Sequence, residues 1–320
     1  MAPSNEFSSL FKNLKTEVGR VIVGQDTLVE RLMIALLSNG HILVEGVPGL
    51  AKTKILSTLT SCINAKMTRI QFTPDLLPSD VLGTEIFRPQ SGEFVVRKGP
   101  IFTNFLLADE INRAPAKVQS ALLQAMQERE VSIGETTFRL PEPFLVFATQ
   151  NPIEQEGTYP LPEAQIDRFL MKVKTAYPSF HEEVAILDVT SREDIEHISV
   201  DKVCTLDELL AARKEAMKVF IDPRIDGYIV SLVQASRNSA SVGLQGMVDW
   251  GASPRASIAL KSCARSLAFI RGLNAVTSDH VKEVAPDVLR HRILTSFDAE
   301  SRGLKSEDII RVILEDIPVP

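Results

Sequence analysis

Apolar residues in the first half of the chain form short runs that alternate with segments of helical spacing. In the segment 26–38, Leu28, Leu32 and Leu36 recur every four residues, as on one face of a helix. Helices are expected at 26–38, 53–63 and 117–129. Apolar runs of strand length lie at 42–45, 67–72, 105–108, 144–149 and 169–171. Strands that alternate with helices predict an α/β fold built on a parallel sheet.

Two further segments alternate between apolar and polar residues and predict hairpins inserted into this core. The expected hairpin strands are 83–87 with 93–97, inside an insertion at 76–100, and 131–133 with 137–140. Pro89-Gln90-Ser91-Gly92 and Gly134-Glu135 supply the turns. A minimal nucleotide-binding sheet does not need the 76–100 insertion.

Beyond Tyr177-Pro178-Ser179 the strand pattern stops and helical periodicity dominates. Helices are expected at 182–187, 206–219, 225–237, 253–271, 278–289 and 306–315. The segment from Gly243 to Gly251 is typical of a loop, and the single tryptophan, Trp250, is expected to pack beside it. We therefore predict an α/β core at 1–177 and a smaller helical domain at 178–320, with a hinge at 175–180.

The segment His41–Thr53 combines a buried strand, a glycine-containing turn and a helix start, which is the pattern of a phosphate cradle. Gly46 and Gly49 allow the tight turn that brings backbone N–H groups to phosphate oxygens. Lys52 suits the β- and γ-phosphates of a nucleotide, and the Thr53 hydroxyl suits Mg²⁺. The residues expected to contact the nucleotide are Gly46, Val47, Pro48, Gly49, Leu50, Ala51, Lys52, Thr53 and Lys54. An ordinary strand-to-helix turn is the alternative.

The general phosphate-loop pattern has a second fixed glycine where this chain has Ala51. Alanine is tolerated at that position only if its φ angle is already helical. Because Ala51 directly precedes the lysine that opens the helix, we expect a helical φ there.

Polar residues follow two of the expected strands. Asp109 and Glu110 come after the run 105–108, and Asn151 follows the run 144–149. The carboxyl ends of parallel strands meet at one edge of a sheet, which places these side chains beside the cradle. Asp109 would hold Mg²⁺ through water, Glu110 would accept a proton from the attacking water, and Asn151 would orient that water. The alternatives are a plain acidic loop start and an Asn-Pro turn.

The short helix within 161–169 delivers Arg168 just before the last apolar run. An arginine in this place can reach the γ-phosphate held by a neighbouring subunit, as an arginine finger does. The alternative is a surface ion pair with Asp167 or Glu163. Arg113, three residues after Glu110, is a second candidate for such a contact across an interface.

This ordered set of motifs resembles the AAA+ ATPases and, more narrowly, the MoxR family. The matching segments are GVPGLAKT at 46–53, LLADEINRAP at 106–115, ATQNP at 148–152 and LPEAQIDRF at 161–169. MoxR-like proteins characteristically carry alanine at the position of Ala51. The segment 251–256, GASPRA, is similar to the second sensor of the family. The resemblance implies that Arg255 touches the γ-phosphate of its own subunit.

The same resemblance implies several properties that spacing alone does not. Val23 and Gly24 would lie against the adenine ring, although a hydrophobic staple before the next helix explains them equally well. The hairpins would line the pore or one face of a ring, expected from the family to have six subunits, that uses ATP and Mg²⁺ to remodel a protein client. MoxR-like proteins commonly act with von Willebrand factor A domain partners on metal centres. Two alternatives stay open: a magnesium-chelatase-like motor subunit, and a nucleotide-dependent scaffold with negligible hydrolysis.

Composition adds limits on partners and compartment. The 320 residues carry 41 acidic and 35 basic side chains, a net charge of −6, which speaks against a nucleic-acid partner. The clustered Arg88, Arg97 and Lys98 are expected to be solvated hairpin charges. Three cysteines without metal-ligand spacing indicate a reducing compartment. The first residues do not resemble a secretory leader, and no run of 18 apolar residues occurs, so a cytoplasmic protein without membrane insertion is expected.

Overall fold

Five parallel strands form the central sheet of the molecule. The computed structural model describes residues 5–47, 49–50, 52–152, 157–190 and 200–320. In spatial order, the strands are β2 (Met67–Gln71), β5 (Phe105–Asp109), β8 (Leu145–Gln150), β1 (Ile42–Glu45) and β9 (Met171–Lys174). Because neighbouring strands all pair in parallel, their carboxyl ends share one edge of the sheet and their amino ends share the other. The predicted parallel α/β sheet is confirmed.

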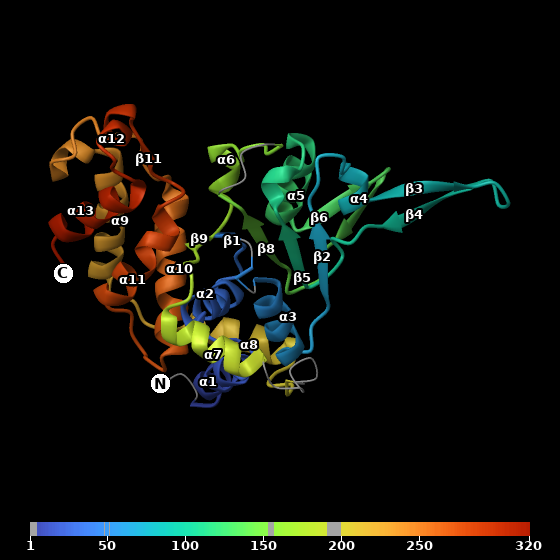
Figure 1. Ribbon diagram of the computed structural model, residues 1–320, viewed down its shortest axis with the longest axis horizontal. Coiled ribbons are helices and arrows are strands. Elements are labelled where there is room, and N and C mark those ends of the chain that lie inside the picture. Colours follow the sequence, from blue (N-terminus) through green and yellow to red (C-terminus); the bar gives the residue numbers. More distant parts are fainter. Residues whose placement is uncertain (1–4, 48, 51, 153–156, 191–199) are drawn as a thin grey trace.

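Helices cover both faces of this sheet (Figure 1). The helices of this part are α1 (Asn5–Gly19), α2 (Asp26–Leu37), α3 (Lys52–Cys62), α4 (Pro78–Leu82), the short 3₁₀ helix η1 (Ile111–Arg113), α5 (Ala116–Glu128) and α6 (Glu163–Ile166). Side chains alternate along a strand, so Ile42 and Phe105 pack with α1, α2 and α3, whereas Leu43 and Leu106 pack with α5. Two hydrophobic cores therefore lie back to back across the sheet.

Helix α1 was not among the helices predicted from the sequence. Its signal is present, because Phe11, Leu14 and Val18 recur at helical spacing, and all three are fully buried. They join the core shared with α2 and α3. The expected helices at 26–38, 53–63 and 117–129 are confirmed to within one residue at each end.

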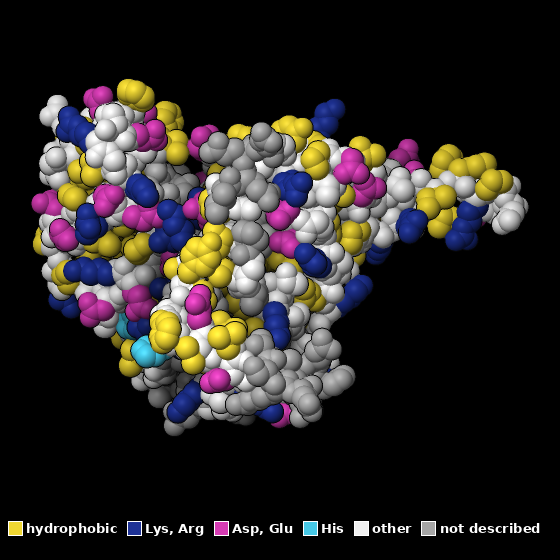
Figure 2. All heavy atoms as spheres, viewed as in Figure 1, with side chains coloured by type: hydrophobic (Ala, Val, Ile, Leu, Met, Phe, Trp, Pro, Cys, Tyr) yellow, Lys and Arg dark blue, Asp and Glu magenta, His cyan; other side chains and the backbone are white. Residues whose placement is uncertain are grey.

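Both predicted hairpins are present. Strand β3 (Gly83–Arg88) pairs antiparallel with β4 (Glu93–Lys98), and β6 (Glu130–Ile133) pairs antiparallel with β7 (Thr136–Arg139). The β3–β4 hairpin projects far from the body of the molecule (Figure 1). Phe87 and Phe94 face each other near its tip with ring centroids 5.2 Å apart, and both are largely exposed. Figure 2 shows hydrophobic and basic side chains side by side on this projection.

The second half of the chain is helical, as predicted. Its part from residue 223 onward lies at the end of the molecule away from the β3–β4 hairpin, whereas residues 180–190 and 206–216 lie near α1, α2 and α3 (Figure 1). Its helices are α7 (Phe180–Thr190), α8 (Leu206–Ala216), α9 (Pro223–Arg237), the 3₁₀ helix η3 (Ser239–Val242), α10 (Pro254–Ile270), α11 (Ser278–Leu289), α12 (Phe297–Ser301) and α13 (Ser306–Asp316). The expected loop from Gly243 to Gly251 is partly wrong, because β10 (Val248–Trp250) pairs there with β11 (Leu294–Thr295). Trp250 is not packed but 72% exposed.

We call the helical second half of the chain, from residue 178 onward, the lid. It packs broadly on the first helices of the chain. One continuous hydrophobic cluster joins α1, α2 and α3 to α8, α9, α10 and α11. Within it, the buried Arg31 of α2 forms a 2.7 Å ion pair with Asp287 of α11. The lid is therefore seated on α2, and the domain boundary after residue 177 stays a prediction. None of the helices in the described part of the chain has both the length and the apolar character that a membrane span requires.

Candidate active site

The cradle begins where β1 ends, at the carboxyl edge of the sheet. A Cβ atom at Gly46 would collide with Thr175 Oγ1, so only glycine fits this close approach to the chain after β9. Gly49 has a φ of 87°, in the left-handed region that favours glycine. Helix α3 starts at Lys52, whose ammonium group donates a 2.7 Å hydrogen bond to the carbonyl oxygen of Gly46. The chain thus turns from strand to helix around a lysine, as the sequence predicted.

The structure describes only some of the other cradle residues. Thr53 and Lys54 follow Lys52 in the first turn of α3, and Leu50 is buried just before it. Pro48 and Ala51 lie outside the described residues, so the helical φ expected for Ala51 stays a prediction. Burial lowers the pKa of Lys52, and the nearby carboxylates of the acidic pair oppose that change.

Asp109, the last residue of β5, is held by two side chains from the neighbouring strands. The Thr149 hydroxyl of β8 donates a 2.6 Å hydrogen bond to Asp109 Oδ1. The Arg69 guanidinium of β2 donates a 2.7 Å hydrogen bond to Asp109 Oδ2. Both carboxylate oxygens are therefore oriented by the sheet itself.

Glu110 follows in a conformation that is rare for a residue with a side chain. Its φ of 56° and ψ of 50° lie in the left-handed region, which stores strain and is found most often at functional sites. Its backbone N–H donates to Thr149 Oγ1 at 2.9 Å. Its carboxylate accepts hydrogen bonds from Gln71 at 2.7 Å and from Arg113 at 3.1 Å. Arg113 is thus engaged by Glu110 of its own subunit, which weakens its candidacy as a finger.

Motif spacing did not identify Arg69, Gln71 and Thr149 as site residues. The signal for the first two was their position on either side of Ile70, which turns both to the same face of β2. The strand register then decides the contact, because Gln71 lies opposite Asp109. Strand order is a tertiary property, and the spacing along the chain does not reveal it.

These residues line one cavity of about 430 Å³. Lys52, Thr53, Asp109, Glu110 and Asn151 all face it, and so do the newly identified residues from β2 and β8. The Thr53 hydroxyl and the Asp109 carboxylate supply the oxygen ligands that Mg²⁺ prefers, and Mg²⁺ usually takes only one or two protein ligands besides phosphate and water. The residues present therefore fit a nucleotide with its Mg²⁺.

The loop predicted to hold the adenine ring precedes α2. Gly24 has a φ of 73° and lies against Glu182 of α7, so a side chain there would meet both backbone strain and a neighbour. Within the described part of the chain, neither Val23 nor Gly24 lines the 430 Å³ cavity. Their contact with adenine stays a prediction.

Arg168 lies at the opposite edge of the sheet. Leu170 donates to the His41 carbonyl, and Met171 opens β9 opposite Ile42 at the start of β1. The cradle begins at Gly46, directly after the last residue of β1 and four residues beyond Ile42. At roughly 3.3 Å per strand residue, the extended chain from Ile42 to Gly46 spans about 13 Å. The structure therefore separates Arg168 from the cradle of its own subunit.

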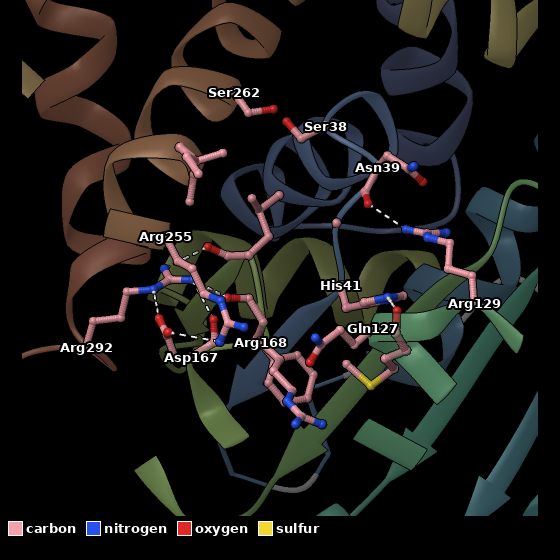
Figure 3. Close-up of a pocket in the computed structure, with 16 residues that line it drawn as sticks. Ser38, Asn39, His41, Gln127, Arg129, Asp167, Arg168, Arg255, Ser262 and Arg292 are labelled. Atoms are coloured by element: carbon pink, nitrogen blue, oxygen red, sulfur yellow. Dashed lines mark hydrogen bonds and ion pairs between the residues drawn. The ribbon is translucent and has the colours of Figure 1, made fainter. Parts of the chain in front are cut away.

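Arg255 lies beside Arg168 and, within the described part of the chain, does not line the 430 Å³ cavity of the cradle. Its expected contact with the γ-phosphate of its own subunit stays a prediction. Arg255 pairs with Asp167 at 3.4 Å, and Ser253 also donates to that carboxylate at 3.1 Å. These bonds seat the start of α10 on the amino edge of the sheet. Arg168 and Arg255 line a second cavity of about 320 Å³, which Figure 3 shows between α10 and the start of β1.

The second cavity is rich in arginine. Its lining includes Arg129, Arg168, Arg255 and Arg292 against a single carboxylate, that of Asp167. Asp167 pairs with Arg255 and Arg292 and not with Arg168, so the local ion pair considered for Arg168 is absent from the described residues. The buried Nε atom of Arg168 has no hydrogen-bond partner within the described part of the chain. Arg168 therefore has an unsatisfied donor atom and no carboxylate partner among the described residues of its own subunit.

Comparison with known proteins identifies the two halves of the chain separately. Residues 41–171 match the ATPase family associated with various cellular activities (AAA), and residues 244–313 match the AAA lid domain. Chaperone MoxR1 of Mycobacterium tuberculosis is 49% identical over 95% of this chain and 81% of its own length. The uncharacterized protein YeaC of Bacillus subtilis is 42% identical over 100% of this chain and 98% of its own. A crystal structure from Cytophaga hutchinsonii superposes with a TM-score of 0.93 at 46% identity, covering 99% of this chain and 97% of that one.

Proposed function

Because the chain belongs to the MoxR family of AAA+ ATPases, we propose that it hydrolyses ATP at sites shared between neighbouring subunits of a ring. One observation carries the proposal: the phosphate cradle and the arginine pair lie at opposite edges of the same sheet. Neither edge holds a full set of groups for phosphoryl transfer, which needs both a positioned water and charge neutralisation of the γ-phosphate. Two subunits placed edge to edge supply the full set.

The geometry also favours the kind of assembly. The two edges are different surfaces, so a contact between them is head-to-tail, and such contacts close into rings when the rotation allows. A ring of six is the number that family resemblance favours. Ile258, which lines the arginine cavity and is 69% exposed, offers an apolar contact beside the charges. Interfaces between proteins are enriched in arginine, and an exposed apolar side chain beside it can add buried area to the contact.

In this proposal each residue has a defined task. Lys52 binds the β- and γ-phosphates, and Thr53 and Asp109 hold Mg²⁺, which neutralises phosphate charge when bound. Glu110 accepts the proton of the attacking water, and Asn151 orients that water. Arg168 and Arg255 of the neighbour approach the γ-phosphate as its charge develops.

We further propose a protein client, with metal-centre maturation alongside a von Willebrand factor A domain partner as its setting. Family membership supports this, and so do the exposed Phe87 and Phe94 on the projecting hairpin. A Glu110→Gln variant that retains ATP should hold the client long enough for capture. ATP-dependent Mg²⁺ insertion into a porphyrin, seen as a change in its absorbance, would instead support the magnesium-chelatase alternative.

The test of shared sites is complementation between two inactive variants. Lys52→Ala removes the cradle lysine but leaves the arginine edge, and Arg168→Ala does the reverse. Mixed oligomers, detected by co-purification of two different tags, should recover phosphate release where an Arg168→Ala cradle meets a Lys52→Ala neighbour. No phosphate release by the parent protein at any concentration would support the scaffold alternative instead.

A further inference from the structure

The run Arg290-His291-Arg292, just after α11, is buried against the segment that carries Arg168. Arg292, with a side chain only 3% exposed, donates from Nε to Asp167 Oδ1 at 2.7 Å. Its two other nitrogens donate to backbone carbonyls: Asp167 at 3.1 Å, Phe169 at 2.6 Å and Leu170 at 3.1 Å. One guanidinium thus binds the chain on both sides of Arg168.

The two residues before Arg292 extend this contact. The His291 Nε2 atom lies 3.2 Å from the carbonyl oxygen of Phe169, to which it must donate. Burial, with the neighbouring Arg292 second, keeps the pKa of His291 well below its ordinary value, so the ring is neutral. Arg290 donates to the Lys172 carbonyl at 2.8 Å. The lid therefore binds four carbonyls between residues 167 and 172.

Asp167 links this contact to Arg255. Its carboxylate accepts from Arg292 at one oxygen and from Arg255 and Ser253 at the other. Figure 3 shows Arg255 and Arg292 meeting at Asp167, with Arg168 next to it. Burial lowers the pKa of Arg292, and its hydrogen bond and ion pair with Asp167 oppose that change. The two lid arginines therefore share one partly buried partner, Asp167, in the loop of Arg168.

We propose that Arg292 is a positioning residue: it fixes the Arg168 loop to the lid, so that Arg168 and Arg255 are presented to a neighbouring subunit as one rigid pair. This inference rests on the proposed shared site. Lysine cannot replace arginine here, because a single ammonium point charge cannot serve a carboxylate and three carbonyls through a planar fork. A loop displaced by about 1 Å is enough to lose roughly 10²-fold in rate.

The test compares Arg292→Lys with the matched control Arg31→Lys. Arg31 is also a buried arginine bound to the lid, through Asp287, but it makes no contact with the Arg168 loop among the described residues. We expect Arg292→Lys to lower kcat by at least about 10²-fold with KM and nucleotide affinity within about threefold of the parent. Arg31→Lys should lower the melting temperature comparably but leave kcat per folded subunit near the parent value.

Complementation supplies the readout that a merely structural defect would not give. Mixed with Lys52→Ala, Arg292→Lys should regain activity as Arg168→Ala does, since its cradle is intact and the neighbour's finger is correctly held. Recovery with Arg168→Ala but not with Arg292→Lys would overturn this inference, as would an equal kcat loss in Arg31→Lys. Failure of Arg168→Ala itself to recover would instead reject the proposed shared site.

A milder variant keeps the test decisive if Arg292→Lys does not fold. Asp167→Asn keeps the shape of the side chain and an acceptor oxygen but removes the charge that attracts Arg292 and Arg255. The same loss of kcat at unchanged KM is expected, with the same recovery on mixing with Lys52→Ala. Parent-like kcat in Asp167→Asn would count against Asp167 as their shared partner.

Discussion

The two edges of the sheet differ in how their charged side chains are used. At the carboxyl edge, three basic side chains and two acidic ones line the cavity, and both acids have firm partners from β2, β8 and η1. At the amino edge, four arginines meet one aspartate. His41 adds no charge there, since burial lowers its pKa to about 3. The first edge fits a nucleotide with its Mg²⁺, and we propose that the second complements an anion held by another subunit.

In the proposed function, this difference means that one chain carries both halves of a site without completing one. A finger close to its own cradle would act without a neighbour, whereas a finger at the far edge makes hydrolysis depend on assembly. Defects at the two edges should therefore belong to two complementation groups.

The largest effect is expected for Arg168→Ala. Loss of an arginine finger lowers hydrolysis by about 10³–10⁵, while the cradle still binds ATP. Arg113→Ala should lose less, because Arg113 is occupied by Glu110 of its own subunit. Phosphate release and nucleotide binding measure both variants. Arg113 would instead be the finger if Arg113→Ala lost more activity than Arg168→Ala and if mixed oligomers of Arg168→Ala and Lys52→Ala recovered no phosphate release.

Glu110→Gln tests the carboxyl edge. It should leave ATP binding nearly intact and slow hydrolysis by about 10²–10⁴, the usual contribution of a positioned general base. Mixed with Arg168→Ala it should restore activity, since the Glu110→Gln subunit still offers an intact finger. Mixed with Lys52→Ala it should not, because both defects belong to the same edge. More than about a third of the parent rate in Glu110→Gln would show that another group is the base.

Arg255→Ala tests whether Arg255 acts on the neighbour's nucleotide, as its place beside Arg168 suggests, or on that of its own subunit, as the sequence alone suggested. A charge-assisted hydrogen bond of about 1.5–3 kcal/mol corresponds to a rate loss of roughly 10–10²-fold. If Arg255 serves the neighbour, mixing with Lys52→Ala should restore phosphate release. If phosphate release stays low in oligomers shown to be mixed, Arg255 acts on the nucleotide of its own subunit.

The smallest effect is expected for Ala51→Gly. With helical φ at Ala51, glycine should change nucleotide affinity little and lower the stability of the helix start by up to about 1 kcal/mol. Thermal unfolding with and without nucleotide measures both quantities. A clear gain in affinity would mean that Ala51 has a positive φ and that the cradle stores strain.

Much of the carboxyl edge is predictable from the amino-acid sequence alone. Gly46, Gly49, Lys52 and Thr53 are close in sequence, and their roles follow from local backbone geometry. Asp109, Glu110 and Asn151 each follow or end an apolar run, and parallel pairing brings such ends together whatever the order of the strands. The alternation of apolar and polar residues likewise predicted both hairpins, because strand periodicity is a local property.

The amino edge depended on tertiary structure. Arg255 carries a recognisable motif, but its place is decided by where α10 begins relative to Asp167, a contact between residues 88 positions apart. Arg292 has no local signal, since its role comes from four hydrogen bonds to the segment 167–170 that form only when the lid is seated on the sheet. Periodicity and motif spacing predict local structure, which depends on residues close together in the sequence. Which distant surfaces meet is decided by tertiary packing. The seating of the lid brings Arg255 to Asp167, and the parallel pairing of β9 with β1 places Arg168 at the edge away from its own cradle.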